Sequence, residues 1–212
     1  MLREFCAQNL TNVPEALRAG ADRVELCDDL SVGGVTPSDE VVFQAVECIH
    51  RLGGSVMVMI RPRGGDFAYG EAELLAMQRS IGVARSAGAD GVVFGCLRNG
   101  SLDVEATKRL VAVSGGLSMT FHMAFDSIRP RQQPETLSDL AYLGFDRVLT
   151  HGGSLAIPLE RCVPHLRELV KAAGDAIAIM PGGGVTWRNA EDIGSALGVR
   201  EVHGTRIVRL QT

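Results

Sequence analysis

Short apolar runs and longer amphipathic stretches alternate along the whole chain. The apolar runs have the length and composition of buried strands, and apolar residues recur in the longer stretches with the spacing of one helix face. The predicted strands span residues 3–8, 22–27, 55–61, 91–95, 118–122, 146–150, 176–180 and 200–203. The predicted helices lie between them, at 12–19, 38–51, 71–87, 103–114, 134–143, 158–173 and 187–196. This alternation places the chain in the α/β class.

A six-residue repeat occurs at the start of every second strand. Residues 19–24 read Ala-Gly-Ala-Asp-Arg-Val, and copies return at 87–92, at 143–148 and, more loosely, at 197–202. Eight strands with their helices within 212 residues suit a compact (β/α)8 TIM-type barrel, whereas a doubly wound sheet of about five or six strands would leave elements unplaced. We therefore expect a single barrel domain over residues 1–212. Its closing C-terminal helix is expected to be short or absent, so that a partner subunit shields the last strand.

Polar side chains share one face of several predicted strands. Because successive side chains of a strand point to opposite faces, the face of each residue follows from its position. Helices cover the outside of such a barrel, so we expect the polar face to line its interior. Buried charges are costly unless they are paired or used, which leaves two interpretations: an ion-pair network that fixes the packing, or a functional site. The residues on this face are Glu4, Cys6, Glu25, Cys27, Arg61, His122, Glu201 and His203.

Cys6 and Cys27 fall at the C-terminal ends of adjacent predicted strands, on the polar face. Neighbouring parallel strands lie about 4.8 Å apart, so the two sulfur atoms can approach one another. Paired thiolates suit a soft ion such as Cu(I), but two buried apolar thiols or a redox pair would show the same spacing. The spacing alone leaves these three interpretations open.

Two loops at the same end of the barrel offer groups that bind anions. Arg61 and Arg63 flank a proline and precede two glycines, and Gly182 and Gly183 open a triple glycine after the strand at 176–180. Arginine binds carboxylate or phosphate, and glycine loops present N–H groups to phosphate. An enzyme acting on a small anionic or phosphorylated substrate is therefore an alternative function, with acid–base groups among Glu25, His122, Glu201 and His203. A purely structural role would explain the same residues: the glycines would allow tight packing, and Arg61 would pair with an interior glutamate.

Composition and charge argue against nucleic acid and membranes as binding partners. The chain carries 21 basic and 25 acidic residues, so it lacks the basic excess of a nucleic-acid-binding surface. No apolar stretch approaches the roughly 20 residues that span a bilayer, and the N-terminus lacks the apolar run of a secretory signal. Five cysteines, an odd number, favour free thiols over a disulfide framework. We expect a cytoplasmic protein that binds neither nucleic acid nor membrane.

Several blocks of the sequence resemble the CutC copper-homeostasis family, and they keep their order across essentially the whole chain. The blocks are Glu4-Phe5-Cys6 and those at 20–27, 33–38, 60–67, 120–126, 147–150 and 201–203. The resemblance implies a (β/α)8 barrel in the cytoplasm, assembled as a homodimer or homotetramer. It also implies Cu(I) binding by the cysteines at Cys6 and Cys27. It implies no particular reaction, so an enzymatic activity stays open.

Overall fold

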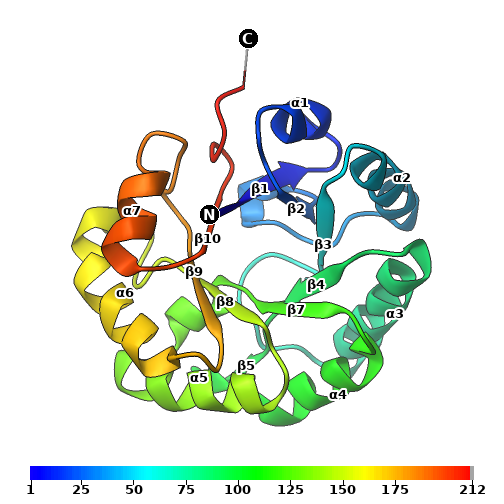
Figure 1. Cartoon of the computed structure of the whole chain (residues 1–212). Coiled ribbons are helices and arrows are strands. Elements are labelled where there is room, and N and C mark those ends of the chain that lie inside the picture. Colours follow the sequence, from blue (N-terminus) through cyan, green and yellow to red (C-terminus); the bar gives the residue numbers. More distant parts are fainter. Residues whose placement is uncertain (211–212) are drawn as a thin grey trace.

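The computed structural model describes residues 1–210, and these form eight parallel strands surrounded by helices (Figure 1). The strands of the barrel are β1 (Leu2–Gln8), β2 (Arg23–Cys27), β3 (Ser55–Met59), β4 (Gly91–Phe94), β7 (Ser118–Phe121), β8 (Arg147–Thr150), β9 (Ala178–Pro181) and β10 (Glu201–Gly204). The helices are α1 (Val13–Arg18), α2 (Asp39–Arg51), α3 (Glu71–Ala87), α4 (Val104–Ser114), α5 (Gln133–Tyr142), α6 (Leu159–Ala173) and α7 (Ala190–Leu197). The predicted (β/α)8 barrel is confirmed, with element ends that differ from the prediction by a few residues.

The strand order around the sheet is β10-β1-β2-β3-β4-β7-β8-β9, so the chain winds once around the barrel. Strands β9 and β10 lie side by side without a ladder between them, and the segments that follow them join instead. There Thr186 bridges Arg206, and the Trp187 N–H donates to the Arg206 carbonyl at 2.8 Å. As far as residue 210, no helix follows β10, as expected. The barrel is therefore nearly closed: β1 pairs with β10, and the one open seam of the described sheet lies between β9 and β10.

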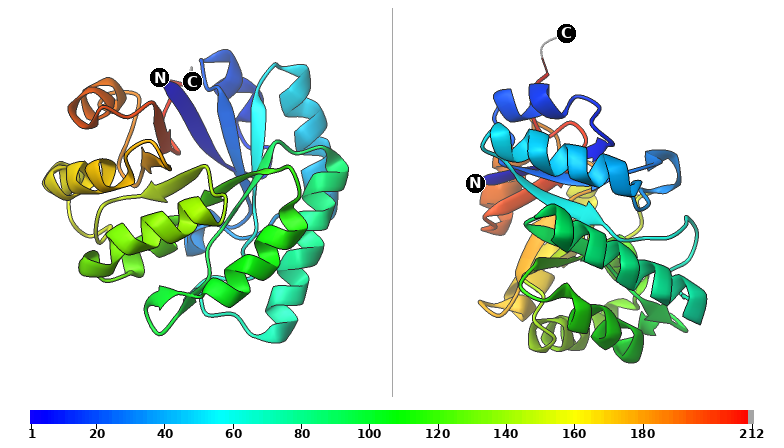
Figure 2. Two further views of the ribbon diagram at one scale, coloured as in Figure 1. Left: turned by 60° about the horizontal axis from the view of Figure 1, so that its bottom comes forward. Right: turned by 90° about the vertical axis from the view of Figure 1, so that its right-hand side faces the viewer.

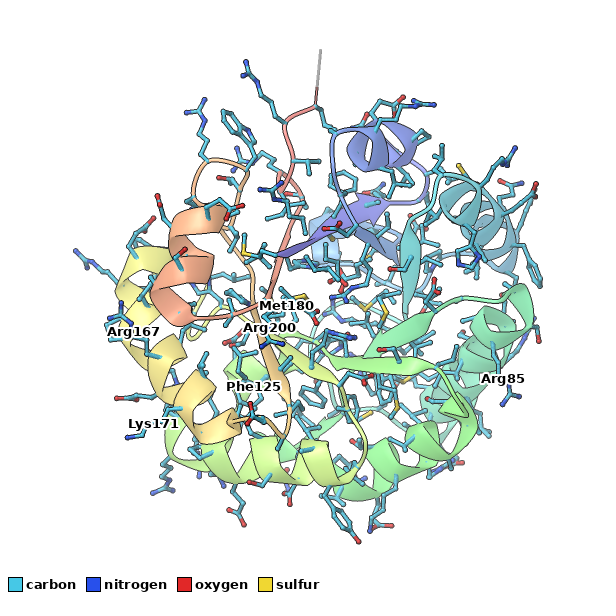
Figure 3. The ribbon with its side chains drawn as sticks, viewed as in Figure 1. Arg85, Phe125, Arg167, Lys171, Met180 and Arg200 are labelled. Atoms are coloured by element: carbon cyan, nitrogen blue, oxygen red, sulfur yellow. The ribbon has the colours of Figure 1, made fainter. Side chains whose placement is uncertain are left out.

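Helices surround the strands on the outside, as two further views show (Figure 2). The outward faces of the strands are apolar and fully buried beneath them, as at Val24, Val58 and Val202. The side chains of the inward faces point into the barrel (Figure 3). No helix in residues 1–210 is long and apolar enough to cross a bilayer.

The aspartates of the sequence repeat tie β1 to β2, β3 to β4 and β7 to β8. Asp22, Asp90 and Asp146 are the fourth residues of three copies, and each accepts a hydrogen bond from the backbone N–H of the second residue of the preceding strand. The three bonds measure 2.7, 2.8 and 2.8 Å. The repeat therefore recurs because the same strand junction recurs, and not because it carries a binding motif.

A small hairpin was not predicted. Strands β5 (Leu97–Arg98) and β6 (Ser101–Leu102) pair antiparallel after β4, around a turn at Asn99 and Gly100. Both turn residues have positive φ, 54° and 75°, the conformation that an Asn-Gly turn favours. Short 3-10 helices also occupy the loops at Leu30–Val32 (η1), Met123–Ser127 (η2) and Pro130–Gln132 (η3).

Candidate functional site

At the amino end of the barrel, every second strand contributes its first residue to one layer of side chains. The layer consists of the fifth residues of the four repeat copies, Arg23, Gly91, Arg147 and Glu201. Glu201 Oε2 accepts from Arg23 at 2.5 Å and from Arg147 at 3.0 Å. Gly91 leaves room for the side chain of Met57, because a Cβ there would lie 2.5 Å from Met57 Sδ. Apolar residues normally fill such layers, and here an ion-pair network replaces them.

Glu4 connects this layer to the middle of the barrel. It is fully buried and accepts hydrogen bonds from Arg23 and, at 2.8 Å, from Nδ1 of His203. Burial by itself would raise the pKa of Glu4, but the bond from His203 and the charge of Arg23 lower it to about 2. The ion-pair interpretation therefore describes the amino end of the barrel. Glu201, predicted as an acid–base group, lies there with its carboxylate held by two arginines.

Two thiols and a carboxylate meet in the middle of the barrel. Cys6 on β1 faces Glu25 on β2 in register, and Cys27 ends β2 two residues further on. Both thiols lie close to the same oxygen of Glu25, Cys6 Sγ at 3.3 Å and Cys27 Sγ at 3.4 Å. One ligand atom from each of the three residues lies within 4.8 Å of the other two. Cys6 lies two residues before the end of β1, and Cys27 is the last residue of β2.

Burial and charge shift the titratable groups of this cluster in opposite directions. A hydrogen bond from Cys27 lowers the pKa of Cys6 well below its usual value, against the effect of burial. The same bond, together with burial, raises the pKa of Cys27, and burial raises the pKa of Glu25. Burial lowers the pKa of His203, but the Glu25 charge and the hydrogen bonds with Cys6 and Glu4 raise it well above the usual range. The cluster thus favours a thiolate at Cys6 beside an imidazolium at His203.

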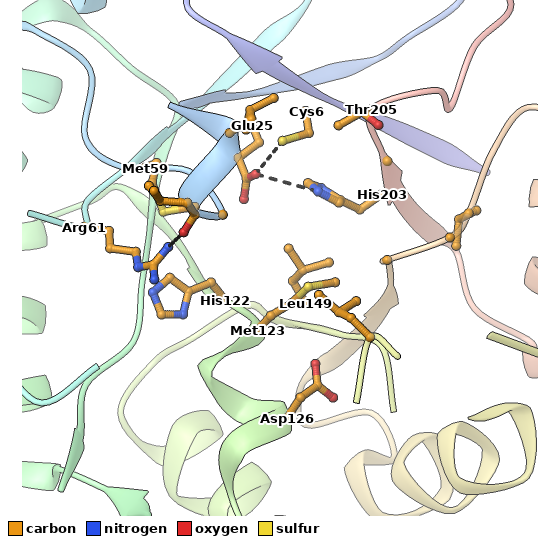
Figure 4. A pocket seen from close by; sticks show the side chains of 18 of the residues that line it. Cys6, Glu25, Met59, Arg61, His122, Met123, Asp126, Leu149, His203 and Thr205 are labelled. Atoms are coloured by element: carbon orange, nitrogen blue, oxygen red, sulfur yellow. Dashed lines mark hydrogen bonds and ion pairs between the residues drawn. The ribbon is translucent and has the colours of Figure 1, made fainter. Parts of the chain in front are cut away.

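A cavity of about 640 Å³ opens at the carboxyl ends of the strands and reaches down to this cluster (Figure 4). Glu25 and His203 face each other at its base, 3.7 Å apart between Oε2 and Nε2. Of the predicted site residues, the cavity is lined by Cys6, Glu25, Arg61, His122, Gly183 and His203. The others lie outside its lining: Cys27, Arg63, Gly182 and Glu201. The structure therefore brings six of the ten predicted residues to one place.

Arg61 and Arg63 hold loops together at the cavity wall and beyond it. The Arg61 guanidinium donates to backbone carbonyls at 2.9–3.0 Å in place of an interior carboxylate; these belong to Val32, Gly34 and Gly65. Arg63 forms ion pairs outside the cavity, with Asp66 at 2.9 Å and Glu73 at 2.6 Å. Both side chains thus have structural partners, and only that of Arg61 borders the cavity.

The glycines after β9 are tightly packed. A Cβ at Gly182 would lie 2.7 Å from Leu149, and one at Gly183 would lie 2.5 Å from Leu155. Real Cβ contacts are not that short, so no other residue fits at either position without displacing the cavity wall. The packing explanation of the glycine loop is therefore sufficient by itself.

Sequence reasoning assigned no role to Asp126, although it stands in one of the blocks that carry the family resemblance. Its carboxylate accepts from the Thr150 hydroxyl at 2.6 Å and from the N–H groups of His151, Gly152 and Gly153 at 2.9–3.2 Å. Asp126 therefore shapes the loop after β8 at the cavity rim. The sequence analysis also assigned no role to Arg23 and Arg147, although both are the fifth residue of a copy of the repeat, which could have indicated that they lie in one layer.

A second group of potential ligand atoms, on Glu4, Glu25 and His203, also lies within 4.8 Å. Glu4 already accepts from Arg23 and His203, and His203 uses Nδ1 for that bond. A metal here would have to displace both bonds. The thiol cluster is the better candidate, since its atoms bond mainly to one another.

Comparison with known proteins matches residues 1–208 to the CutC family. A CutC family protein of Enterococcus faecalis is 44% identical over 209 residues, which cover 98% of this chain and 100% of the relative. The human copper homeostasis protein cutC homolog is 42% identical over 206 residues, which cover 95% of this chain and 72% of the relative. A solved CutC structure from Streptococcus agalactiae superposes with a TM-score of 0.96 at 44% identity, over 98% of this chain and 100% of that one.

More distant structures share the fold alone. Deoxyribose phosphate aldolase of Aeropyrum pernix aligns with a TM-score of 0.68 at 14% identity, over 99% of this chain and 86% of that one. The family model, the relatives and the structure of the Streptococcus agalactiae protein all extend over nearly the whole barrel. The chain belongs to the CutC family.

Proposed function

We propose that this chain binds Cu(I) between Cys6 and Cys27 and serves copper homeostasis. The human relative is named a copper homeostasis protein, and the resemblance implies Cu(I) at these two positions. The observation that carries the proposal is the meeting of two buried thiols from adjacent strands at one buried carboxylate.

The donor set fits a soft ion. Thiolate and thioether sulfur prefer Cu(I), whereas hard ions such as Mg²⁺ prefer oxygen. Cys6 and Cys27 pack in one inner cluster with Met57, Met59 and Val93, so four sulfur-bearing side chains share the same apolar environment. Cys27 is fully buried and Cys6 nearly so, which limits access of water to the pair. Two thiolates with the thioethers nearby would supply what Cu(I) requires.

The charges around the pair also suit a cuprous dithiolate. Cu(I) bound by two thiolates carries a net charge of −1, and an unpaired charge is costly inside a protein. His203 supplies the opposite charge, because its pKa is raised. Glu25, whose pKa burial raises, can remain protonated and donate a hydrogen bond to sulfur, while the bonds with Cys6 and Glu4 still raise the pKa of His203. The occupied site would then be close to neutral.

Anaerobic competition titration against a calibrated Cu(I) chelator tests the proposal. We expect one tightly bound ion in the wild type, and a loss of affinity on the order of 100-fold or more in Cys6→Ser and in Cys27→Ser. Cys48→Ser, which removes a free thiol from α2, is the matched control and should bind like the wild type. Far-UV circular dichroism checks that each variant is folded. Unchanged affinity in both site variants would refute the proposal.

We also propose that the protein is cytoplasmic and assembles into a homodimer or homotetramer. All five cysteines are free thiols, which supports a reducing compartment. The assembly is what the family resemblance implies, and light scattering of the purified protein measures it directly. A monomer at micromolar concentration would refute this part.

A further inference from the structure

The cavity above the thiol cluster is much larger than a copper ion requires. Its volume of about 640 Å³ lies within the usual range of small-molecule sites, roughly 300–1,000 Å³. A two-coordinate ion needs only the space between its two sulfur ligands. The walls are largely apolar, with contributions from Met59, Phe67, Met123, Leu149 and Leu155. Such a cavity can enclose an organic molecule.

We propose that this cavity binds a small organic thiol that carries amide and carboxylate groups, about the size of a tripeptide, and that Cu(I) arrives as the complex of this thiol. The inference rests on the proposed Cu(I) site and specifies the form in which the ion is delivered. Three observations support it: unpartnered polar atoms in the lining, the position of Cys6, and a free cation at the rim.

Polar atoms of the lining are buried without a partner. Glu25 Oε1, Arg61 Nε and His122 Nε2 form no hydrogen bond within residues 1–210, although each side chain is at most 5% exposed. His122 Nδ1 accepts from the Ala124 N–H at 3.2 Å, so the neutral ring carries its proton on Nε2 and can donate it. Buried polar groups normally have partners. A ligand with both N–H donors and carboxylate acceptors, as a peptide has, would satisfy Glu25 on one side and His122 on the other.

The thiol pair is open to the cavity through Cys6 alone. Cys6 belongs to the lining, whereas Cys27 lies behind it and is fully buried. A thiol-bound Cu(I) ion in the cavity therefore meets Cys6 first, and two Cu–S bonds to the carrier are replaced by two Cu–S bonds to the protein. The exchange balances as [RS–Cu–SR]⁻ plus the Cys6 thiolate and the Cys27 thiol giving the protein dithiolate complex, RSH and RS⁻. Copper stays Cu(I) throughout, and the Cys27 proton moves to one released carrier molecule while the other leaves as its thiolate.

The rim offers one arginine that is free to bind a carboxylate. Arg206 lines the cavity on the segment after β10, is exposed, and makes no side-chain ion pair or hydrogen bond in the described part of the chain. The other charged groups of the lining are engaged: Arg61 with carbonyls, Asp126 with the loop after β8, and His203 with Glu4 and Glu25. A carboxylate of the carrier would therefore bind to the guanidinium of Arg206.

Calorimetric titration of the metal-free protein with S-methylglutathione, a tripeptide whose sulfur is blocked, tests the cavity without copper. We expect a single site with a dissociation constant below about 1 mM, and binding at least about fivefold weaker in Arg206→Ala. Arg209→Ala is the matched control, because Arg209 lies on the same segment, stacks on Trp187 and does not line the cavity. No binding at 10 mM, or equal binding in the wild type and Arg206→Ala, would overturn the proposal.

Stopped-flow transfer of Cu(I) gives the second readout. We expect Arg206→Ala to slow delivery from the glutathione complex at least about fivefold, and to leave delivery from the complex of cysteamine, a thiol without a carboxylate, unchanged. The proposal would be overturned if Arg206→Ala took up Cu(I) from the glutathione complex as fast as the wild type does. If the protein binds Cu(I) normally but does not bind the tripeptide, the carrier proposal is refuted and the copper site stands. If it binds the tripeptide but not Cu(I), the proposed function is refuted instead.

Discussion

Replacing Glu4 by glutamine tests how strongly the ion-pair network holds the inside of the barrel. Glu4 is fully buried and bonds to Arg23 and His203. Against the effect of burial, these partners lower the pKa of Glu4 from its usual 4.5 to about 2. That difference corresponds to about 3 kcal/mol of folding free energy at neutral pH. Glu4→Gln removes this contribution, so we expect it to destabilise the protein by about that amount at pH 7.

The lowered pKa also determines how the effect depends on pH. The unfolded chain takes up the proton near pH 4.5, whereas the folded chain takes it up only near pH 2. The contribution of Glu4 is therefore complete above pH 4.5 and is lost as the pH falls toward 2. At pH 3.5 about 2 kcal/mol of it should remain. The cost of Glu4→Gln should shrink accordingly between pH 7 and pH 3.5.

Urea unfolding followed by circular dichroism at these two pH values measures both quantities. Glu191→Gln is the matched control, because Glu191 pairs with Arg3 at 2.6 Å but is 68% exposed. Exposed pairs contribute at most about 1 kcal/mol, so the control should cost no more than that at pH 7. The reasoning is refuted if Glu4→Gln costs no more than the control at pH 7, or if its cost does not decrease at pH 3.5.

Two other positions are open to equally direct tests. Gly91→Ala should destabilise the protein by roughly 1–3 kcal/mol, because the new Cβ would lie 2.4 Å from a backbone oxygen of β7. Gly82→Ala on α3 should instead stabilise the protein by up to about 1 kcal/mol, because a Cβ there has no atom within 4 Å. Urea unfolding compares the two variants, and an unchanged stability of Gly91→Ala would contradict the packing argument. Burial and the nearby Arg61 lower the pKa of His122 to about 3, so its NMR signals should not titrate between pH 5 and 8. Folding stability should therefore fall as the pH drops below 6.5, where only the unfolded chain protonates this ring, and a midpoint near 6.5 for folded His122 would show that it is not shielded.

The barrel could be predicted because its signals are local. Strand and helix periodicity depends on which side chains face the core, and a regular barrel presents the same environment to every strand. The repeat at Asp22, Asp90 and Asp146 gave the pairing of units for the same reason, since each aspartate meets the same strand junction. The alternation of faces even indicated which polar residues lie inside. These features follow from the order of residues along the chain.

The sequence could not determine the height of each residue along the barrel axis, which depends on strand register. Glu201 and His203 share a face of β10, but the first lies in the ion-pair layer and the second at the base of the cavity. Strand register likewise places Cys6 of β1 beside Glu25 of β2, and Cys27 lies two residues after Glu25 on β2. Contacts between strands that are not neighbours, such as Arg147 with Glu201, arise only when the sheet curls around its interior.

The sequence by itself thus determined the fold, the inward face and the two thiols, because all three follow from spacing along single strands. Only the tertiary structure decided which charges neutralise one another and which remain available to a ligand. It paired Glu4 and Glu201 with arginines, and it left Glu25 and His122 with unpartnered atoms in the lining of the cavity. The physical reason is that the cost of a buried charge depends on its neighbours in space, and closing the barrel brings those neighbours from distant parts of the chain.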